Sequence, residues 1–217
     1  MNKFISEVTN EDCMEGMARY PDKYFDLAIV DPPYGINIAT EIDRSGFKEG
    51  SSRNSLSKYE SSMLNKIWDN STPSLEYFNE LFRISKNQII WGGNYFDLKP
   101  TKCFVVWDKM TYIPTMSQIE LAWTSIKKHS QLVKINSNQL DRFHPTQKPV
   151  ALYKWLLSNY AKQGDKILDT HLGSGSSRIA AYEMGFDFTA FEIDTEYFEA
   201  QEKRYKAHIA QLKLELI

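Results

Sequence analysis

The chain has 217 residues, of which 42% are hydrophobic and 13% aromatic, and a formal net charge of −2. This length and composition are typical of one α/β domain over residues 1–217, and no segment approaches the about 20 consecutive apolar residues of a membrane span. The two cysteines, Cys13 and Cys103, stand far apart, which disfavours both a disulfide framework and a metal site. The N-terminus lacks the apolar segment of a signal peptide, so we expect a cytoplasmic protein.

Apolar runs of strand length predict seven strands. They lie at residues 4–8, 27–30, 88–91, 104–107, 120–124, 167–169 and 188–192. Helical patterns between them predict helices at 12–19, 73–84, 150–161, 175–184 and 195–216. Thr72 is the expected N-cap of the second helix. In the last helix, one face is expected to pack against a sheet; its residues are Phe198, Tyr205, Ile209, Leu212 and Leu216. Strands that alternate with helices predict a doubly wound, mostly parallel sheet.

The turn Asp31-Pro32-Pro33-Tyr34 follows the apolar run Phe25 to Val30, at the end of a predicted buried strand. An exocyclic amine of a nucleobase is conjugated with its ring, so a catalyst gains by accepting hydrogen bonds from its N–H groups. Asp31 and the Pro32 carbonyl can be these acceptors, and Tyr34 can stack on the base. A structural Pro-Pro turn is the alternative. The turn predicts methylation of an exocyclic amino group.

A basic, polar segment follows, and it predicts a mobile loop at about residues 36–69. Between residues 44 and 66 it holds five basic side chains against two acidic ones. Nucleic-acid affinity depends on local charge, so Arg44, Lys48, Arg53 and Lys58 are candidate DNA contacts. A solvated surface loop is the alternative.

A glycine turn, Gly173-Ser174-Gly175, joins the strand that ends at Asp169 to a helix and lets a ligand approach the backbone closely. Arg178 stands where a dinucleotide fingerprint has its third glycine, and no Gly-Lys-Ser/Thr follows for a phosphate-binding loop. Glu192, at the tip of the next strand, can accept hydrogen bonds from both hydroxyls of a ribose. The pattern predicts a nucleoside-containing cofactor.

Together these segments resemble the β group of amino-group DNA methyltransferases, and the resemblance covers nearly the whole chain. Residues 31–34 resemble their motif IV, residues 144–149 (His-Pro-Thr-Gln-Lys-Pro) resemble motif X, and residues 169–177 resemble the S-adenosylmethionine loop, motif I. The chain order, IV, X and I, is that of the β group. The stretches 91–96, 106–109 and 120–125 are similar to a compact bacteriophage or prophage subset.

The resemblance implies a Rossmann-like S-adenosylmethionine-dependent methyltransferase fold with a circularly permuted motif order. Its sheet runs 3-2-1-4-5-7-6 with strand 7 antiparallel, and this chain begins at strand 3 and closes with strands 1 and 2. The cofactor is S-adenosyl-L-methionine. Asp12 and Cys13 resemble the contact to its adenine amine, although Asp12 alone would be interpreted as a helix N-cap, and Thr146 and Lys148 are candidates for its methionine end. The expected cofactor-binding residues are Asp12, Cys13, Asp31, Thr146, Lys148, Asp169, Leu172, Gly173, Ser174, Gly175, Ser176 and Glu192. The expected catalytic residues are Asp31, Pro32, Pro33 and Tyr34.

The function that the resemblance implies is DNA adenine-N6 methylation of a flipped-out base, in a bacterial or phage-infected cell, with DNA as the partner, no membrane and no metal. A homodimer is left open. Asp31, where cytosine-N4 enzymes more often carry Ser, favours adenine. The alternatives are cytosine-N4 methylation, an RNA or protein-glutamine acceptor, an inactive cofactor- and DNA-binding protein, and a Rossmann-type oxidoreductase.

Two features depart from the family pattern. A common form of its cofactor loop has Asp-Pro-Phe where this chain has Asp169-Thr170-His171. We expect His171 to be a hydrogen-bonded residue at the pocket rim without a catalytic role. No target-recognition domain of ordinary size is visible, so recognition is expected to come from residues 36–69 and 127–142.

Overall fold

The computed structural model describes residues 4–36, 69–112, 117–138, 142–144 and 146–215. The strands within these ranges are β1 (Ser6–Thr9), β2 (Phe25–Val30), β3 (Ser85–Trp91), β4 (Phe104–Asp108), β5 (Ile119–Thr124), β6 (Gln131–Lys134), β7 (Lys166–Asp169) and β8 (Asp187–Phe191). The α-helices are α1 (Cys13–Ala18), α4 (Leu75–Ile84), α5 (Val150–Tyr160), α6 (Ser176–Met184) and α7 (Thr195–Glu215), with a short 3-10 helix η2 (Gly93–Tyr95).

The strands form one sheet in the order β1-β8-β7-β2-β3-β5-β4-β6. Strand β5 is antiparallel to both of its neighbours, and the other pairs are parallel. The first seven positions reproduce the predicted order 3-2-1-4-5-7-6 with strand 7 antiparallel, which confirms that prediction. The prediction of seven strands is wrong by one, because β6 adds an eighth at the edge. Val133 alone is buried in β6, so its sequence has too little apolar pattern to predict a strand.

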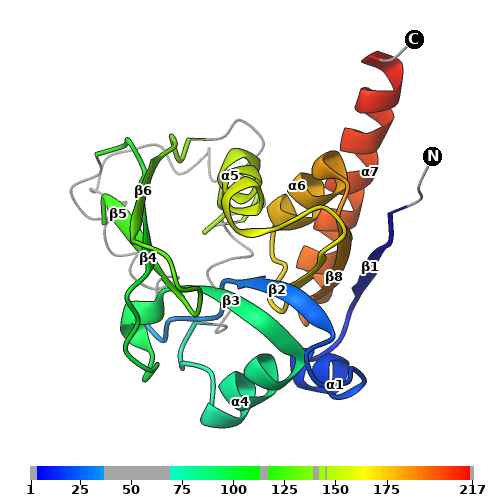
Figure 1. Cartoon of the computed structure of the whole chain (residues 1–217). Coiled ribbons are helices and arrows are strands. Elements are labelled where there is room, and N and C mark those ends of the chain that lie inside the picture. Colours follow the sequence, from blue (N-terminus) through cyan, green and yellow to red (C-terminus); the bar gives the residue numbers. More distant parts are fainter. Residues whose placement is uncertain (1–3, 37–68, 113–116, 139–141, 145, 216–217) are drawn as a thin grey trace, which may run out of the picture.

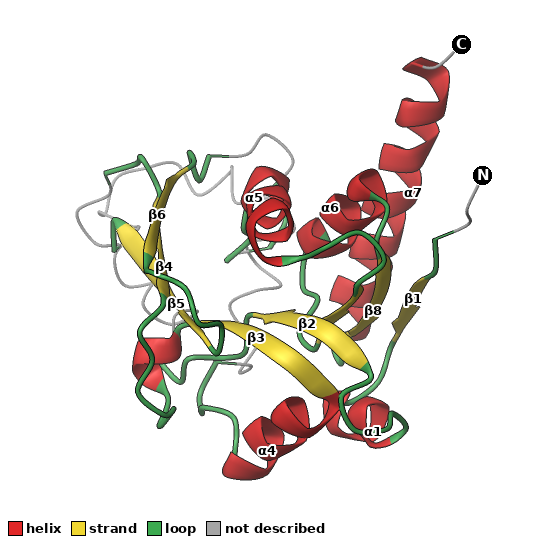
Figure 2. Cartoon of the chain, viewed as in Figure 1, coloured by secondary structure: helices red, strands yellow, loops and turns green. Residues whose placement is uncertain are grey.

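Helices cover both faces of the sheet: α5, α6 and α7 lie on one side, and α1 and α4 on the other (Figure 1). The colouring by secondary structure shows this layering most directly (Figure 2). The side chains of strand β2 point alternately to the two faces of the sheet, so both faces need a layer of helices to cover them. Leu27 and Ile29 pack in the core under α5 and α6, whereas Ala28 and Val30 pack in the core over α1 and α4. A strand buried on both faces is typical of a doubly wound sheet.

Two helix predictions need correction. Helix α4 begins after Ser74, whose side chain accepts a hydrogen bond from the Tyr77 N–H, so Ser74 and not Thr72 is the N-cap. Among the described side chains of α7 the buried positions are Tyr197, Gln201 and Tyr205, one turn apart. Of the predicted apolar face, only Tyr205 is buried; Phe198, Ile209 and Leu212 are half-buried, and Leu216 lies outside the described residues. Gln201 is buried because its side-chain oxygen accepts a hydrogen bond from Arg178 of α6. Among the described residues, no helix is long and apolar enough to span a membrane.

Candidate active site

Three acids predicted to bind ligand stand at the carboxyl ends of three adjacent strands. Asp31 follows β2, Asp169 ends β7 and Glu192 follows β8, in the sheet order β8-β7-β2. Because parallel strands end at the same edge, the fold brings these acids together. The pKa of Asp169 is raised to about 7, chiefly by burial and also by the charges of Asp31 and Glu192, against two hydrogen bonds that lower it. A buried acid of this kind at a strand end is typical of a functional site.

Both carboxylate oxygens of Asp31 are engaged. The Tyr34 hydroxyl donates to Oδ1 at 2.6 Å, and the Lys148 ammonium donates to Oδ2 at 2.6 Å. The turn between these residues is fixed by Asp69, which accepts the backbone N–H groups of Tyr34 (2.7 Å) and Gly35 (2.9 Å). Burial raises the pKa of Asp31, and the Lys148 charge opposes this rise. The first and last residues of the predicted catalytic turn therefore contact each other directly.

Lys148 is the buried centre of an ion-pair chain. Its side chain is 2% exposed, and its Nζ lies 2.6 Å from Asp31 Oδ2 and 3.0 Å from Glu120 Oε2. Lys109 Nζ lies 2.7 Å from the other oxygen of Glu120. Burial alone would lower the pKa of the Lys148 ammonium, but Asp31 and Glu120 raise it above its ordinary value. The sequence marked Lys109 and Glu120 only as parts of family-like stretches, because nothing in a sequence shows which distant charges will meet.

The Tyr34 ring is surrounded by aromatic and glycine residues. It stacks on Tyr95 with ring centroids 5.1 Å apart and an interplanar angle of 16°, and it meets the edge of Phe96 at 6.1 Å. Gly92 adopts a φ of +67°, and a Cβ atom there would stand 2.2 Å from the Tyr34 ring. Glycine is therefore required at position 92 on two grounds, backbone conformation and space.

The glycine turn is held on both sides. Glu192 accepts the backbone N–H groups of Gly173 (2.7 Å) and Asp194 (2.9 Å). From α7, Arg204 donates to the Ser174 carbonyl and to the Ser176 hydroxyl, both at 2.9 Å. The positive φ angles of Gly173 (53°) and Gly175 (74°) turn the chain into α6. Leu172, the remaining residue predicted in this turn, is buried.

Thr170 and His171, where the sequence departs from the Asp-Pro-Phe form of the cofactor loop, belong to a chain of hydrogen bonds. The Tyr77 hydroxyl and Thr170 Oγ1 are 2.7 Å apart, and Thr170 Oγ1 and His171 Nδ1 are 2.9 Å apart. Burial lowers the pKa of His171 to about 4, with Asp12 opposing the decrease. His171 is therefore a neutral, hydrogen-bonded imidazole at ordinary pH.

Asp12 and Cys13 lie at the start of α1. The Asp12 carboxylate accepts the Met14 N–H at 2.7 Å, so it is an N-cap. Burial, together with the charges of Asp12 and Glu192, raises the pKa of the Cys13 thiol to about 12. The backbone N–H of Glu11 donates to the Glu192 carbonyl at 3.1 Å, which ties the start of α1 to the end of β8. Asp12 and Cys13 thus lie near Glu192, and their contact with a cofactor stays a prediction.

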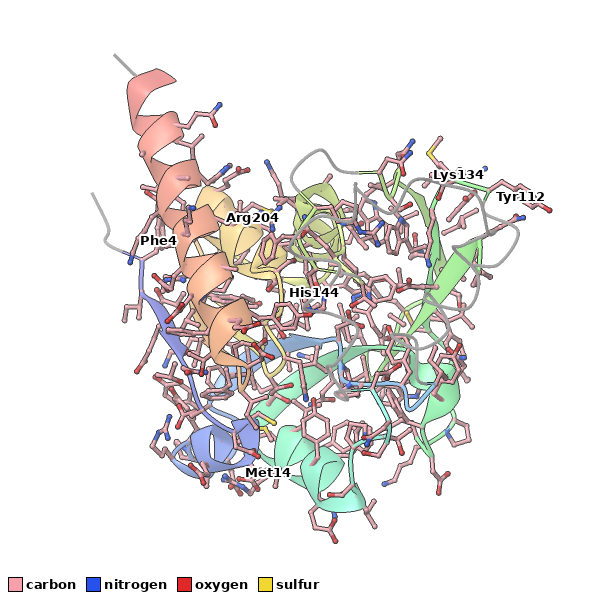
Figure 3. All side chains as sticks on the ribbon, turned by 180° about the vertical axis from the view of Figure 1, so that it is seen from behind. Phe4, Met14, Tyr112, Lys134, His144 and Arg204 are labelled. Atoms are coloured by element: carbon pink, nitrogen blue, oxygen red, sulfur yellow. The ribbon has the colours of Figure 1, made fainter. Side chains whose placement is uncertain are left out.

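The described residues before α5 contact both the glycine turn and Asp31. His144 packs on Tyr197 of α7 with ring centroids 4.4 Å apart, and Figure 3 shows it near the middle of this side of the molecule. The His144 ring also lies beside Gly173, and its Nδ1 is 3.3 Å from the Thr146 hydroxyl. Lys148, two residues on, reaches Asp31 and Glu120 instead. The structure thus places Thr146 near the glycine turn and Lys148 in the Asp31 site.

The described residues leave two further predictions untested. The candidate DNA contacts Arg44, Lys48, Arg53 and Lys58 lie outside the described residues. Within the described ranges, no group of three acidic, histidine or cysteine side chains is arranged to hold a metal ion.

The strand order, the glycine turn and the strand-end acids give the chain the predicted S-adenosylmethionine-dependent methyltransferase fold. A family model described as DNA methylase, for N6 and N4 methyltransferases, matches residues 60–203. The chain belongs to this family, which confirms the predicted family.

Curated relatives are type II methyltransferases. M2.DpnII of Streptococcus pneumoniae is 28% identical over 175 residues, covering 80% of this chain and 56% of its own length. M.HinfI of Haemophilus influenzae is 24% identical over 254 positions, with 95% of this chain and 70% of its own length covered. The chain thus spans a little over half of the first relative and more of the second.

Solved structures of similar fold include the M1.HpyAVI–SAM complex, with a TM-score of 0.60 at 18% identity, covering 92% of this chain and all of that one. TTHA0409 of Thermus thermophilus, complexed with S-adenosyl-L-methionine, has a TM-score of 0.56 at 15% identity and 94% coverage of both chains. PvuII DNA methyltransferase, a cytosine-N4-specific enzyme, has a TM-score of 0.58 at 13% identity, covering 92% of this chain and 86% of that one. At these identities the likeness concerns the fold alone.

Proposed function

We propose that this chain is a DNA methyltransferase that transfers the methyl group of S-adenosyl-L-methionine to the exocyclic N6 of adenine. The position of Asp31 carries the proposal: the carboxylate stands at the end of β2, and the adjacent strand β7 leads into the glycine turn. A base held at Asp31 and a nucleoside held at the turn would meet at one edge of the sheet.

The negative charge at this end of the sheet supports this cofactor. Asp12, Asp31, Asp169 and Glu192 gather there, as the effects of their charges on one another and on Cys13 indicate. Clustered carboxylates attract a cation and repel the pyrophosphate of a nicotinamide dinucleotide, which disfavours the oxidoreductase alternative. S-adenosylmethionine supplies a methyl group on a cationic sulfur, which keeps the electron pair of the broken C–S bond. Glu192 would hold the ribose, Asp12 the adenine, and Thr146 the methionine end.

The residues after β2 supply the chemistry at the base. Asp31 and the Pro32 carbonyl accept hydrogen bonds from the amine, which makes its nitrogen more tetrahedral and turns its lone pair outward. Pro33 completes the rigid turn, and the Tyr34 ring provides a face for the flipped-out base. One well-placed acceptor of this kind contributes about 3 kcal/mol to transition-state stabilisation. The N–H proton that the methylated nitrogen sheds has Asp31 as a nearby acceptor.

DNA would dock along the basic segment that contains Arg44, Lys48, Arg53 and Lys58, because local positive charge neutralises phosphates. Changing all four residues to Gln should reduce the salt dependence of DNA binding, by a log–log slope of up to about 0.9 for each phosphate that is no longer neutralised. An unchanged slope would move the docking face elsewhere.

Adenine is favoured over cytosine by the acid at position 31. The PvuII enzyme, named as cytosine-N4-specific, shares the fold. Architecture alone therefore does not distinguish the two bases, and the product has to be measured.

Incubation of the purified protein with DNA and methyl-labelled S-adenosylmethionine tests the function, followed by nucleoside digestion and mass spectrometry. We expect N6-methyladenine. A product of N4-methylcytosine would overturn the choice of base and leave the transferase standing. Absence of label in DNA, with cofactor binding intact, would instead support the alternative of an inactive binding protein.

A further inference from the structure

Two charged residues beside the site have no role in the function proposed above. Lys109 follows β4 and Glu120 lies in β5, on adjacent antiparallel strands. They extend the Asp31–Lys148 pair into a line of four alternating charges. The N–O distances along it are 2.7 Å from Lys109 to Glu120, 3.0 Å from Glu120 to Lys148 and 2.6 Å from Lys148 to Asp31.

The line keeps a buried ammonium charged. Lys148 is almost fully inaccessible, and a lone buried ammonium would release its proton. Glu120 is the second of the two carboxylates at Lys148, and its negative charge opposes this loss of the proton. Its own pKa is lowered despite burial, because Lys148 and Lys109 favour its charged form. The titratable and charged groups that interact with Asp31, Glu120 or Lys148 are Tyr34, Tyr77, Lys109, Arg142, Tyr153 and Asp169.

The arrangement also distinguishes the two oxygens of Asp31. Oδ2 is bound to Lys148, which Glu120 holds from its other side. Oδ1 is bound to the neutral Tyr34 hydroxyl. An entering amine needs one of these oxygens. Displacing the uncharged Tyr34 hydroxyl breaks one hydrogen bond, whereas displacing Lys148 would break a buried ion pair, which is more costly.

We infer that Glu120 is a positioning residue for methyl transfer: supported by Lys109, it holds Lys148 protonated against Oδ2 of Asp31, so that Oδ1 alone exchanges the Tyr34 hydroxyl for the target amine. The inference rests on the proposed function, since it concerns the same carboxylate. Its consequence is a dependence on pH: without Glu120, Lys148 has one carboxylate partner, loses its proton at lower pH and ceases to hold Asp31.

The test compares Glu120→Gln with Glu80→Gln. Glu80 is the control, because it is an acid of helix α4 that also pairs with a basic residue, Arg83 of the same helix. For Glu120→Gln we expect kcat at neutral pH to fall about tenfold or more. We also expect the alkaline limb of its kcat–pH profile to shift to lower pH by about one pH unit or more. KM for S-adenosylmethionine and for DNA should stay nearly unchanged. Glu80→Gln should resemble the wild type in all three respects.

Two additions keep the test decisive. If Glu120→Gln folds poorly, the double variant Glu120→Gln/Lys109→Gln removes a whole ion pair and should show the same kinetic change in a more stable protein. NMR titration of 13C-labelled lysine, with Lys148 assigned by Lys148→Arg, reports the charge of Lys148 without any turnover. A Lys148 titration in Glu120→Gln equal to that in the wild type would overturn the inference, as would equal pH profiles of Glu120→Gln and Glu80→Gln. A wild type that transfers no methyl at any pH would overturn the proposed function, and the inference with it.

Discussion

Glu192 accepts the backbone N–H of Gly173 at 2.7 Å, so the acid at the end of β8 and the glycine turn after β7 form one unit. Glu192 also accepts the backbone N–H of Asp194 at 2.9 Å. The carboxylate that shapes the turn thus stands at the turn itself, where a bound nucleoside would place its ribose hydroxyls.

Replacement of Glu192 by Ala should therefore weaken S-adenosylmethionine binding. Loss of an acceptor from two hydroxyls costs roughly 1.5 to 3 kcal/mol, which is about a 10- to 150-fold higher dissociation constant by calorimetry. Glu183→Ala is the control, because Glu183 pairs with Lys154 and His208 at the far end of α6. An unchanged dissociation constant in folded Glu192→Ala would remove Glu192 from the cofactor site.

Asp31→Ala should abolish methyl transfer while most of the cofactor affinity remains. The expected loss of kcat is about 100-fold or more, from the absence of one well-placed acceptor. Asp26→Ala is the matched control at the opposite end of β2, where Asp26 pairs with Lys86. Near-normal turnover of Asp31→Ala, measured by label transfer, would contradict the catalytic assignment.

The order of the sheet was predictable from the sequence, because three motifs in a permuted order, IV, X and I, define it once the family resemblance is recognised. The edge strand β6 was not, since one buried residue in four gives no pattern. At the site, Asp31, Asp169 and Glu192 were predictable because each ends an apolar run, and parallel strands end together.

The ion-pair partners of Lys148 were not predictable from the sequence. Lys148 lies 117 residues from Asp31, and its partners come from the end of β2 and from β5, which β3 separates in the sheet. Its motif predicted a cofactor contact, which stays a prediction; the partners that the structure shows are Asp31 and Glu120. Local sequence carries no signal for such pairs, since their geometry depends on every element between them.

The pKa of Asp169 near 7 predicts a pH dependence of cofactor binding. Above this pH the group is ionised and attracts a cation; below it the carboxyl is neutral. The affinity for S-adenosylmethionine should therefore rise from pH 6 to pH 8, by at most about tenfold per unit below the pKa. Calorimetry of the wild type and Asp169→Asn checks this, because the variant should have a flatter profile. Parallel profiles would show that Asp169 does not contact the cofactor's charge.

His171 should make the protein sensitive to acid. Its folded-state pKa of about 4 lies below the ordinary value of 6.5, so the unfolded chain binds a proton more readily than the folded one. Stability that is present above pH 6.5 is therefore lost as the pH falls towards 4. Relative to His171→Phe, the wild type should lose about 1 to 2 kcal/mol of unfolding free energy between pH 7 and pH 5.

Urea denaturation at the two pH values measures the difference. His129→Phe is the control, because His129 is exposed. If the wild type and His171→Phe lose the same stability, the imidazole is protonated in the folded protein and is not buried as a neutral group.

Gly92→Ala should damage catalysis through the Tyr34 ring. Position 92 has a φ of +67°, and its added Cβ would stand 2.2 Å from Tyr34, so the ring must shift away from its stack on Tyr95. Gly164→Ala is a matched control, because Gly164 has a φ of +90° but no atom within 4 Å of an added Cβ. Both variants carry backbone strain of order 1 kcal/mol, and Gly92→Ala alone carries the clash.

We expect both variants to bind S-adenosylmethionine normally. Gly92→Ala alone should lose about tenfold or more in kcat, since small displacements of a positioning group have effects of this size. Equal turnover of the two variants would show that the position of the Tyr34 ring does not matter for transfer.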